Sequence, residues 1–123
     1  MPEAALIAII DDDEGMRVSL DGLLRSMGLR TTLYSNAEGF LNSESFSATD
    51  CIICDVHMPG GMSGLDLAHK LSSSRSPTPI ILMSGFSDHE CREALRRSQI
   101  RHLLAKPFDD ETLIACLDEA LAA

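Results

Sequence analysis

Short β-prone runs alternate with helical patterns along the chain, and this alternation constrains the fold more than any other feature. Each run is four or five residues long, and most of the runs are apolar throughout rather than at every second position. Strands that are apolar on both faces are typical of parallel sheets buried between two layers of helices. The five runs are 6–10, 31–34, 51–54, 80–83 and 102–105.

The segments between these runs carry helical signals. Met16, Leu20 and Leu24, for example, recur at helical spacing, and Gly28 then offers a helix stop. The helices expected on such grounds are 14–27, 36–41, 63–71, 88–97 and 109–121. Five strands that alternate with five helices predict an α/β fold, in which a five-stranded parallel sheet is doubly wound, as in flavodoxin-like proteins, with helices on both faces.

Size and composition exclude several classes of protein. The 123 residues suit one domain, so we expect residues 1–123 to form a single domain with no output domain. A net charge of −9 disfavours direct binding to nucleic acid, because its phosphates need a basic surface. No apolar run approaches the roughly 20 residues of a membrane helix, and the N-terminus lacks a signal-peptide pattern, so we expect a cytoplasmic protein without membrane contact.

Two of the four cysteines, Cys51 and Cys54, form a C-x-x-C pair, a pattern found in redox and zinc sites. The pair lies within an apolar run that we expect to be a strand. Residues three apart on a strand point to opposite faces, so the two thiols cannot readily share a metal ion or form a disulfide. We therefore favour packing in the core over a redox or zinc site.

Polar and charged residues follow four of the five expected strands. Asp11 and Asp12 follow the first strand, and Asp55 follows the third. Ser84 follows the fourth strand, and Lys106 follows the fifth. In doubly wound sheets the carboxyl ends of parallel strands share one edge, and ligands bind there where the strand order reverses. Each residue alone could be a helix-terminal acid, a turn former, a loop hydroxyl or a surface lysine, but together they predict one site.

The chemistry of these side chains favours a divalent cation and a phosphoryl group. Clustered carboxylates repel one another, and a hard cation such as Mg²⁺ or Mn²⁺ relieves that repulsion. A carboxylate can attack phosphorus to form an aspartyl phosphate, and this transfer needs mainly positioning and neutralisation of charge. A metal ion, a lysine and a hydroxyl group supply both. Asp13 and Glu14, by contrast, are expected only to stabilise the N-terminus of the next helix.

At these positions the sequence resembles the receiver domain family of bacterial two-component response regulators. The matching stretches span nearly the whole chain, in order and at about the family's spacing, at 9–14, 55–59, 62–64, 81–85 and 106–108. The likeness is greatest to a branch whose longer members carry a helix-turn-helix output domain. The resemblance implies that the protein accepts a phosphoryl group from a phosphohistidine on a sensor histidine kinase or a phosphotransfer protein.

The resemblance also implies a metal site and an acceptor. Asp55 is the expected phosphoacceptor, Asp12 a direct metal ligand, and Asp11 a partner of Asp12 that often acts through water. His57 occupies the position whose backbone carbonyl binds the metal ion, so its side chain takes no part in ligation. The side chains of His57 and Phe86 flank the site in the family, where they tune the entry of water during self-dephosphorylation.

Two further residues match the switch of the family. Ser84 is the expected hydroxyl that follows the phosphoryl group, and Lys106 is the amine that pairs with the phosphoryl group or with Asp55. The bond between Lys106 and Pro107 matches one that is commonly cis. Phosphorylation is expected to change the face formed by the fourth helix, the fifth strand and the last helix, which a downstream protein or a second copy of the chain then binds. An arginine cluster near this face fits either an acidic partner or solvent, and consists of Arg92, Arg96, Arg97 and Arg101.

Leu103 departs from the family pattern. The last strand usually carries an aromatic switch residue three positions before the lysine, whereas leucine neither hydrogen-bonds nor has a ring to swing. Leu103 therefore cannot provide the usual coupling of an aromatic rotamer to the hydroxyl at position 84. That hydroxyl belongs to serine here, in place of the commoner threonine. The neighbouring His102 points to the opposite face of the strand, and we expect it at the surface rather than as a titrating site.

Two alternatives remain open. A pseudo-receiver would use the same fold as a phosphorylation-independent interaction module. Leu103 favours it, as does the loop after Asp55, which Gly60-Gly61 makes one residue longer and, we expect, more mobile; the intact aspartate, serine and lysine set argues against it. A phosphatase with an aspartate nucleophile would place a second acid two residues further on, where this chain has His57.

Overall fold

Five parallel strands form one sheet in the computed structural model, which describes residues 4–74, 76–85, 93 and 102–122. The strand order is β2-β1-β3-β4-β5, so the order reverses between β1 and β3. The predicted doubly wound, flavodoxin-like α/β fold is confirmed. The strands are β1 (Leu6–Ile10), β2 (Arg30–Tyr34), β3 (Cys51–Asp55), β4 (Ile80–Ser84) and β5 (His102–Ala105).

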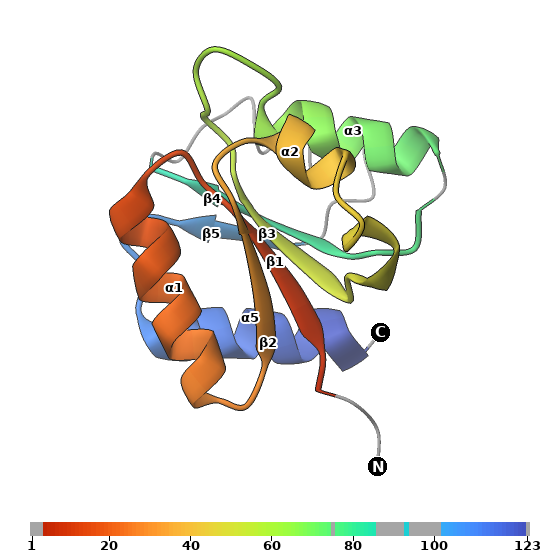
Figure 1. Cartoon of the computed structure of the whole chain (residues 1–123). Helices are drawn as coiled ribbons and strands as arrows, with labels where there is room; N and C mark the ends of the chain where they lie inside the picture. The colour runs from red at the N-terminus through yellow and green to blue at the C-terminus, as the bar shows by residue number, and fades with distance from the viewer. Residues whose placement is uncertain (1–3, 75, 86–92, 94–101, 123) are drawn as a thin grey trace.

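Helices cover both faces of this sheet. Figure 1 shows α1 and α5 on one face and α2 and α3 on the other. Their bounds are α1 (Glu14–Ser26), α2 (Ala37–Leu41), α3 (Gly64–Ser73) and α5 (Asp110–Ala122), and a short 3₁₀ helix, Phe46–Ala48, precedes β3. Apart from Glu93, the helix expected at 88–97 lies outside the described residues, as do the arginine cluster and Phe86. No helix in the described part of the chain is both long and apolar enough to cross a membrane.

Capping residues set the points at which the helices begin. Asp13 and Asn36 each accept a backbone hydrogen bond as the N-caps of α1 and α2. Ser63 and Asp66 form a reciprocal capping box at the start of α3. Such caps satisfy backbone N–H groups that have no partner within the helix. Glu14 lies in the first turn of α1, so the expected helix-terminal role of this acid is confirmed.

The core consists of two layers, one on each side of the sheet. Cys54 belongs to the layer under α2 and α3, and Cys51 to the layer under α1 and α5. Both thiols are fully buried and free, which confirms that the C-x-x-C pair packs in the core. Burial raises the pKa of Cys51 to about 12 and also raises the pKa of Cys54, so neither forms a thiolate readily.

Candidate functional site

Three carboxylates gather at the carboxyl edge of the sheet, where the strand order reverses. Asp11 and Asp12 follow β1, and Asp55 ends the adjacent strand β3. One oxygen of each carboxylate lies within 4.8 Å of an oxygen of the other two. Asp11 and Asp55 are buried, whereas Asp12 is exposed. The structure therefore brings together the three aspartates that the sequence singles out.

Lys106 brings a positive charge to the same place. Its Nζ lies 3.4 Å from Asp55 Oδ2 and 3.5 Å from Asp11 Oδ2. The residue follows β5, and its backbone N–H donates to the carbonyl oxygen of Ser84 at 2.7 Å. The Lys106–Pro107 peptide bond is cis, as the family resemblance implies. One ammonium group thus contacts two of the three carboxylates.

The buried position of Asp11 makes its charge costly. Burial raises the pKa of this carboxyl above its ordinary value, and the nearby charge of Asp55 raises it further. The backbone N–H of Asp13, which donates to Asp11 Oδ1 at 2.9 Å, and the ammonium of Lys106 lower the pKa but do not cancel the rise. The carboxylate pair is therefore only partly compensated by the groups around it.

Ser84 and His57 flank the carboxylates. Ser84 is fully buried at the end of β4, one residue beyond Met83, which pairs with Asp55 in the sheet. The side chain of His57 is exposed, and its backbone N–H donates to Asp55 Oδ1 at 3.3 Å. Both residues thus lie where the sequence places them. The metal-binding role of the His57 carbonyl stays a prediction.

Gly64 allows α3 to lie close to β3, the strand that ends in Asp55. A Cβ atom at this position would lie 2.5 Å from the carbonyl oxygen of Asp55 and 3.0 Å from Cα of Val56, both of which are backbone atoms. Only glycine allows the first turn of α3 to approach the end of β3 this closely. Gly64 lies in a stretch that matches the family, but the sequence analysis assigned no role to it. A glycine at the start of a helix was the signal that could have indicated a close approach of the helix to another element.

The oxygen cluster can hold a divalent cation. Magnesium binds oxygen at about 2.1 Å in an octahedral arrangement, which places its ligand oxygens roughly 3 to 4 Å apart. The carboxylate oxygens are within 4.8 Å of one another, so small side-chain adjustments would bring them into range. Three carboxylates and one ammonium leave two net negative charges, which a divalent cation would balance.

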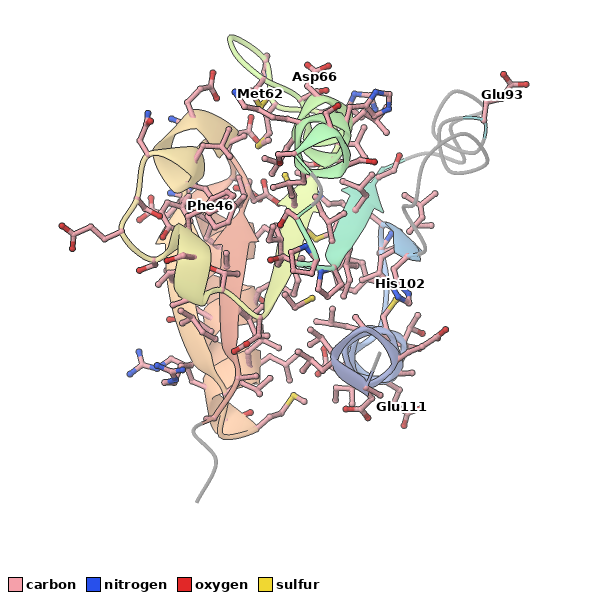
Figure 2. The ribbon with its side chains drawn as sticks, turned by 90° about the vertical axis from the view of Figure 1, so that its right-hand side faces the viewer. Phe46, Met62, Asp66, Glu93, His102 and Glu111 are labelled. Carbon is pink, nitrogen blue, oxygen red and sulfur yellow. The ribbon has the colours of Figure 1, made fainter. Side chains whose placement is uncertain are left out.

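His102 corrects one expectation. Only 8% of its surface is exposed, and its Nδ1 lies 3.8 Å from the Sγ of Cys116 on α5, so the prediction of a surface histidine is wrong. Figure 2 shows His102 on β5 beside α5. Helix α5 covers this face of β5, and its position over the strand cannot be predicted from the sequence of the strand alone. Leu103 packs on the opposite layer, as the alternation of the strand predicts.

The family follows from comparison with known proteins. The family model of the response regulator receiver domain matches residues 7–118 of the chain. The chain belongs to the response regulator receiver domain family. It is a receiver domain of two-component response regulators, and nothing in the comparisons favours the pseudo-receiver alternative.

Related receiver proteins agree with this assignment. The transcriptional regulatory protein FixJ of Bradyrhizobium diazoefficiens is 37% identical over 116 residues, which are 94% of this chain and 56% of FixJ. The response regulator protein TodT of Pseudomonas putida is 37% identical over 118 residues, which are 96% of this chain and 52% of TodT. This receiver chain thus spans about half the length of the curated relatives that it matches.

A solved receiver domain has the same fold. The BeF3-activated DrrB receiver domain superposes with a TM-score of 0.84 at 27% identity, and the match covers 98% of this chain and 99% of that domain.

Proposed function

We propose that this receiver domain is a Mg²⁺-dependent phosphorylation switch whose acceptor is Asp55. The observation that carries the proposal is the cluster of Asp11, Asp12 and Asp55 oxygens, with the ammonium of Lys106 at 3.4 Å from Asp55. A carboxylate, two further acids and a lysine are the groups that phosphoryl transfer to an aspartate requires. Phosphorylation on aspartate and dependence on Mg²⁺ are general to the family.

Each side chain has a proposed role in the transfer. Asp12 and Asp55 would bind the metal ion directly, Asp11 through water, and His57 through its backbone carbonyl. A Mg²⁺ or Mn²⁺ ion held by these residues would supply positive charge to offset the charge of the phosphoryl oxygens. A carboxylate oxygen of Asp55 attacks the phosphorus of the donor, so that a P–O bond forms as the bond from phosphorus to the donor histidine breaks.

The remaining two residues act on the product. Lys106 already contacts Asp55, and its ammonium group would pair with the phosphoryl oxygens that appear there. The hydroxyl of Ser84 would donate a hydrogen bond to one of these oxygens. Ser84 ends β4 and Lys106 follows the neighbouring strand β5, so their response to phosphorylation would alter the carboxyl ends of β4 and β5. Self-dephosphorylation by water would reverse the switch.

The family membership supports an inference about the donor and the output. The donor would be a sensor histidine kinase or a phosphotransfer protein, and we expect the reaction to take place in the cytoplasm. We assign residues 1–123 to one receiver domain. Its output would be contact with a downstream protein, or with a second copy, through a face that includes β5 and α5. A net charge of −9 disfavours direct contact with nucleic acid.

Intact mass after treatment with acetyl phosphate tests the proposal. With Mg²⁺ the wild-type protein should gain the mass of one phosphoryl group, and with EDTA it should gain none. Asp55→Asn should gain none under either condition, because an amide is not a nucleophile for phosphorus. Glu14→Gln, which removes an exposed acid near the same edge of the sheet, should behave as wild type. A wild-type protein that gains no mass at saturating donor and Mg²⁺ would instead support the pseudo-receiver.

A further inference from the structure

One side chain links the loop after the acceptor strand to α2. Glu38, in the first turn of α2, accepts a hydrogen bond through Oε2 from the backbone N–H of Met62 at 3.2 Å. In Figure 1 the loop between β3 and α3 rises beside α2, and Figure 2 labels Met62 at the α3 end of this loop. Among the described residues, no other hydrogen bond joins residues 59–62 to a helix or strand.

The two ends of the loop are fixed independently of Glu38. The backbone N–H of Val56 donates to the carbonyl oxygen of Met83 at 2.8 Å, and the N–H of Gly64 donates to the carbonyl oxygen of Val56 at 3.0 Å. Met58 is buried in the core layer under α2 and α3. The part of the loop without such anchors is the exposed tip around Gly60 and Gly61.

A cavity of about 240 Å³ lies between this loop, the start of α2 and the metal site. It is lined by Asp12, Ser35, Asn36, Glu38 and residues 58–62. The partly buried side chain of Met62 packs against the core layer beside this cavity, whereas Gly60 and Gly61 at the exposed tip have no side chain to pack there. The position of the tip therefore sets the shape of the space beside Asp12, which is a proposed metal ligand. It also constrains the loop that carries His57, whose backbone carbonyl is a second proposed ligand.

Gly61 shows that the two elements approach closely. A Cβ atom at position 61 would lie 2.6 Å from Oε2 and 3.3 Å from Oε1 of Glu38. The absent side chain thus leaves the room that the carboxylate occupies. Gly60, with φ of +88°, makes the turn just before this contact. The two glycines that lengthen the loop are thus the residues that turn it and bring it against Glu38.

We infer that Glu38 is a positioning residue for phosphorylation. Its carboxylate holds the tip of the β3–α3 loop, and the loop in turn keeps the space beside Asp12 and the backbone of His57 in a fixed arrangement. Among the described residues, Glu38 forms no hydrogen bond or ion pair with Asp11, Asp12 or Asp55, so it acts through the loop. The inference rests on the proposed function, because it concerns the rate of the same reaction.

Amide hydrogen exchange tests the link itself. In Glu38→Ala the exchange rate of the Met62 amide, measured by NMR, should rise by about threefold to tenfold, because its hydrogen-bond acceptor is lost. Glu38→Gln keeps an acceptor oxygen and should restore most of the protection. Glu44→Ala removes another exposed acid close to α2 and should leave the Met62 amide unchanged.

The rate of phosphorylation by acetyl phosphate at subsaturating Mg²⁺ tests the consequence. Glu38→Ala should slow it by about threefold to tenfold, the effect expected from losing one such hydrogen bond, whereas Glu38→Gln should restore it. The melting temperature of all three proteins should be nearly the same, since Glu38 is exposed and the loop ends are anchored elsewhere. A purely structural role would change the melting temperature and leave the Mg²⁺ dependence of the rate unaltered.

A double-mutant cycle isolates the contact. Gly61→Ala should displace the carboxylate and slow phosphorylation about as much as Glu38→Ala, while the double variant should be no slower than either single variant. The inference is overturned if Glu38→Ala leaves both the exchange and the rate unchanged, or if Glu44→Ala slows the reaction equally. A wild-type protein that is not phosphorylated at all would refute the proposed function, and the inference with it.

Discussion

At the scale of single residues, the raised pKa of Asp11 shows most directly how burial and neighbouring charges act on the site. An aspartate carboxyl ordinarily titrates with a pKa of 3.8, and burial raises the pKa of Asp11 in the folded protein above that value. Between the two pKa values the folded state binds more protons than the unfolded state. The free energy of unfolding therefore falls as the pH rises through this window, and above the folded pKa the loss is complete.

Asp11→Asn should accordingly stabilise the protein in EDTA at pH 7, by about 1 kcal/mol, the usual size of a single-residue effect. The amide oxygen can still accept the hydrogen bond from the Asp13 N–H, so the local backbone should be retained. The fall in stability as the pH rises above the ordinary aspartate pKa of 3.8 should become shallower, because the buried charge no longer forms. Urea unfolding at several pH values measures both effects.

Mg²⁺ should reverse this order. At a concentration 100 times its Kd, a ligand that binds only the folded state adds about 2.7 kcal/mol, and the wild-type protein should show a gain of this size while Asp11→Asn shows less. A variant that is less stable than wild type in EDTA, or one that gains as much from Mg²⁺, would contradict the proposed role of Asp11.

The residues of the site were predictable because each lies at or just after the end of a strand. Contacts between residues far apart in the sequence, such as those of His102 and Glu38, were not predictable. Asp11, Asp55 and Lys106 are recognisable from the chain, since the parallel topology brings strand ends together whatever the side chains do. The burial of His102 depends on the closing helix above it. The contact of Glu38 with Met62 joins positions 24 apart, and no periodicity or local motif encodes it.

At the scale of elements, the approach of α3 to β3 positions Asp55, the proposed acceptor. The first residue of α3 is Gly64, and its N–H donates to the carbonyl oxygen of Val56 at 3.0 Å, one residue beyond the acceptor. A side chain at this point would meet backbone atoms that cannot rotate away. The spacing between the helix and the strand therefore depends on a single missing Cβ.

Gly64→Ala should lower the free energy of unfolding by about 2 kcal/mol, a typical cost of overpacking, and should also slow phosphorylation because the end of β3 must shift. The matched control is Gly22→Ala in α1, where a Cβ would meet nothing within 4 Å. That change should instead stabilise the protein by about 0.5 to 1 kcal/mol, the difference in helix propensity. Chemical denaturation and the acetyl phosphate assay measure the two outcomes. Equal effects of the two substitutions would show that the close approach does not matter.

The strands were easier to predict than the elements around them. All positions of β1, β3 and β4 are buried, and their uninterrupted apolar runs signal this directly. The edge strand β2 is partly exposed, and it begins at Arg30, one residue before the expected start. The 3₁₀ helix Phe46–Ala48 was not expected, because three residues are too few to establish a period.

At the scale of the whole molecule, the fold converts sequence order into a site. β1 and β3 are neighbours although α1, β2 and α2 separate them along the chain, and β5 closes the sheet beyond β4. Groups 95 residues apart, Asp11 and Lys106, thereby come within 3.5 Å. A switch built at this edge can signal through the strands and helices that extend from it.

The most direct test of the proposed switch is to locate the phosphoryl group on the chain. After reaction with acetyl phosphate and Mg²⁺, borohydride reduces an aspartyl phosphate to homoserine, and peptide mass spectrometry then identifies the converted residue. We expect conversion at Asp55, none in EDTA, and none at Asp11 or Asp12. Conversion at either of these two residues, or an unmodified Asp55 when Mg²⁺ and donor are saturating, would contradict the proposal.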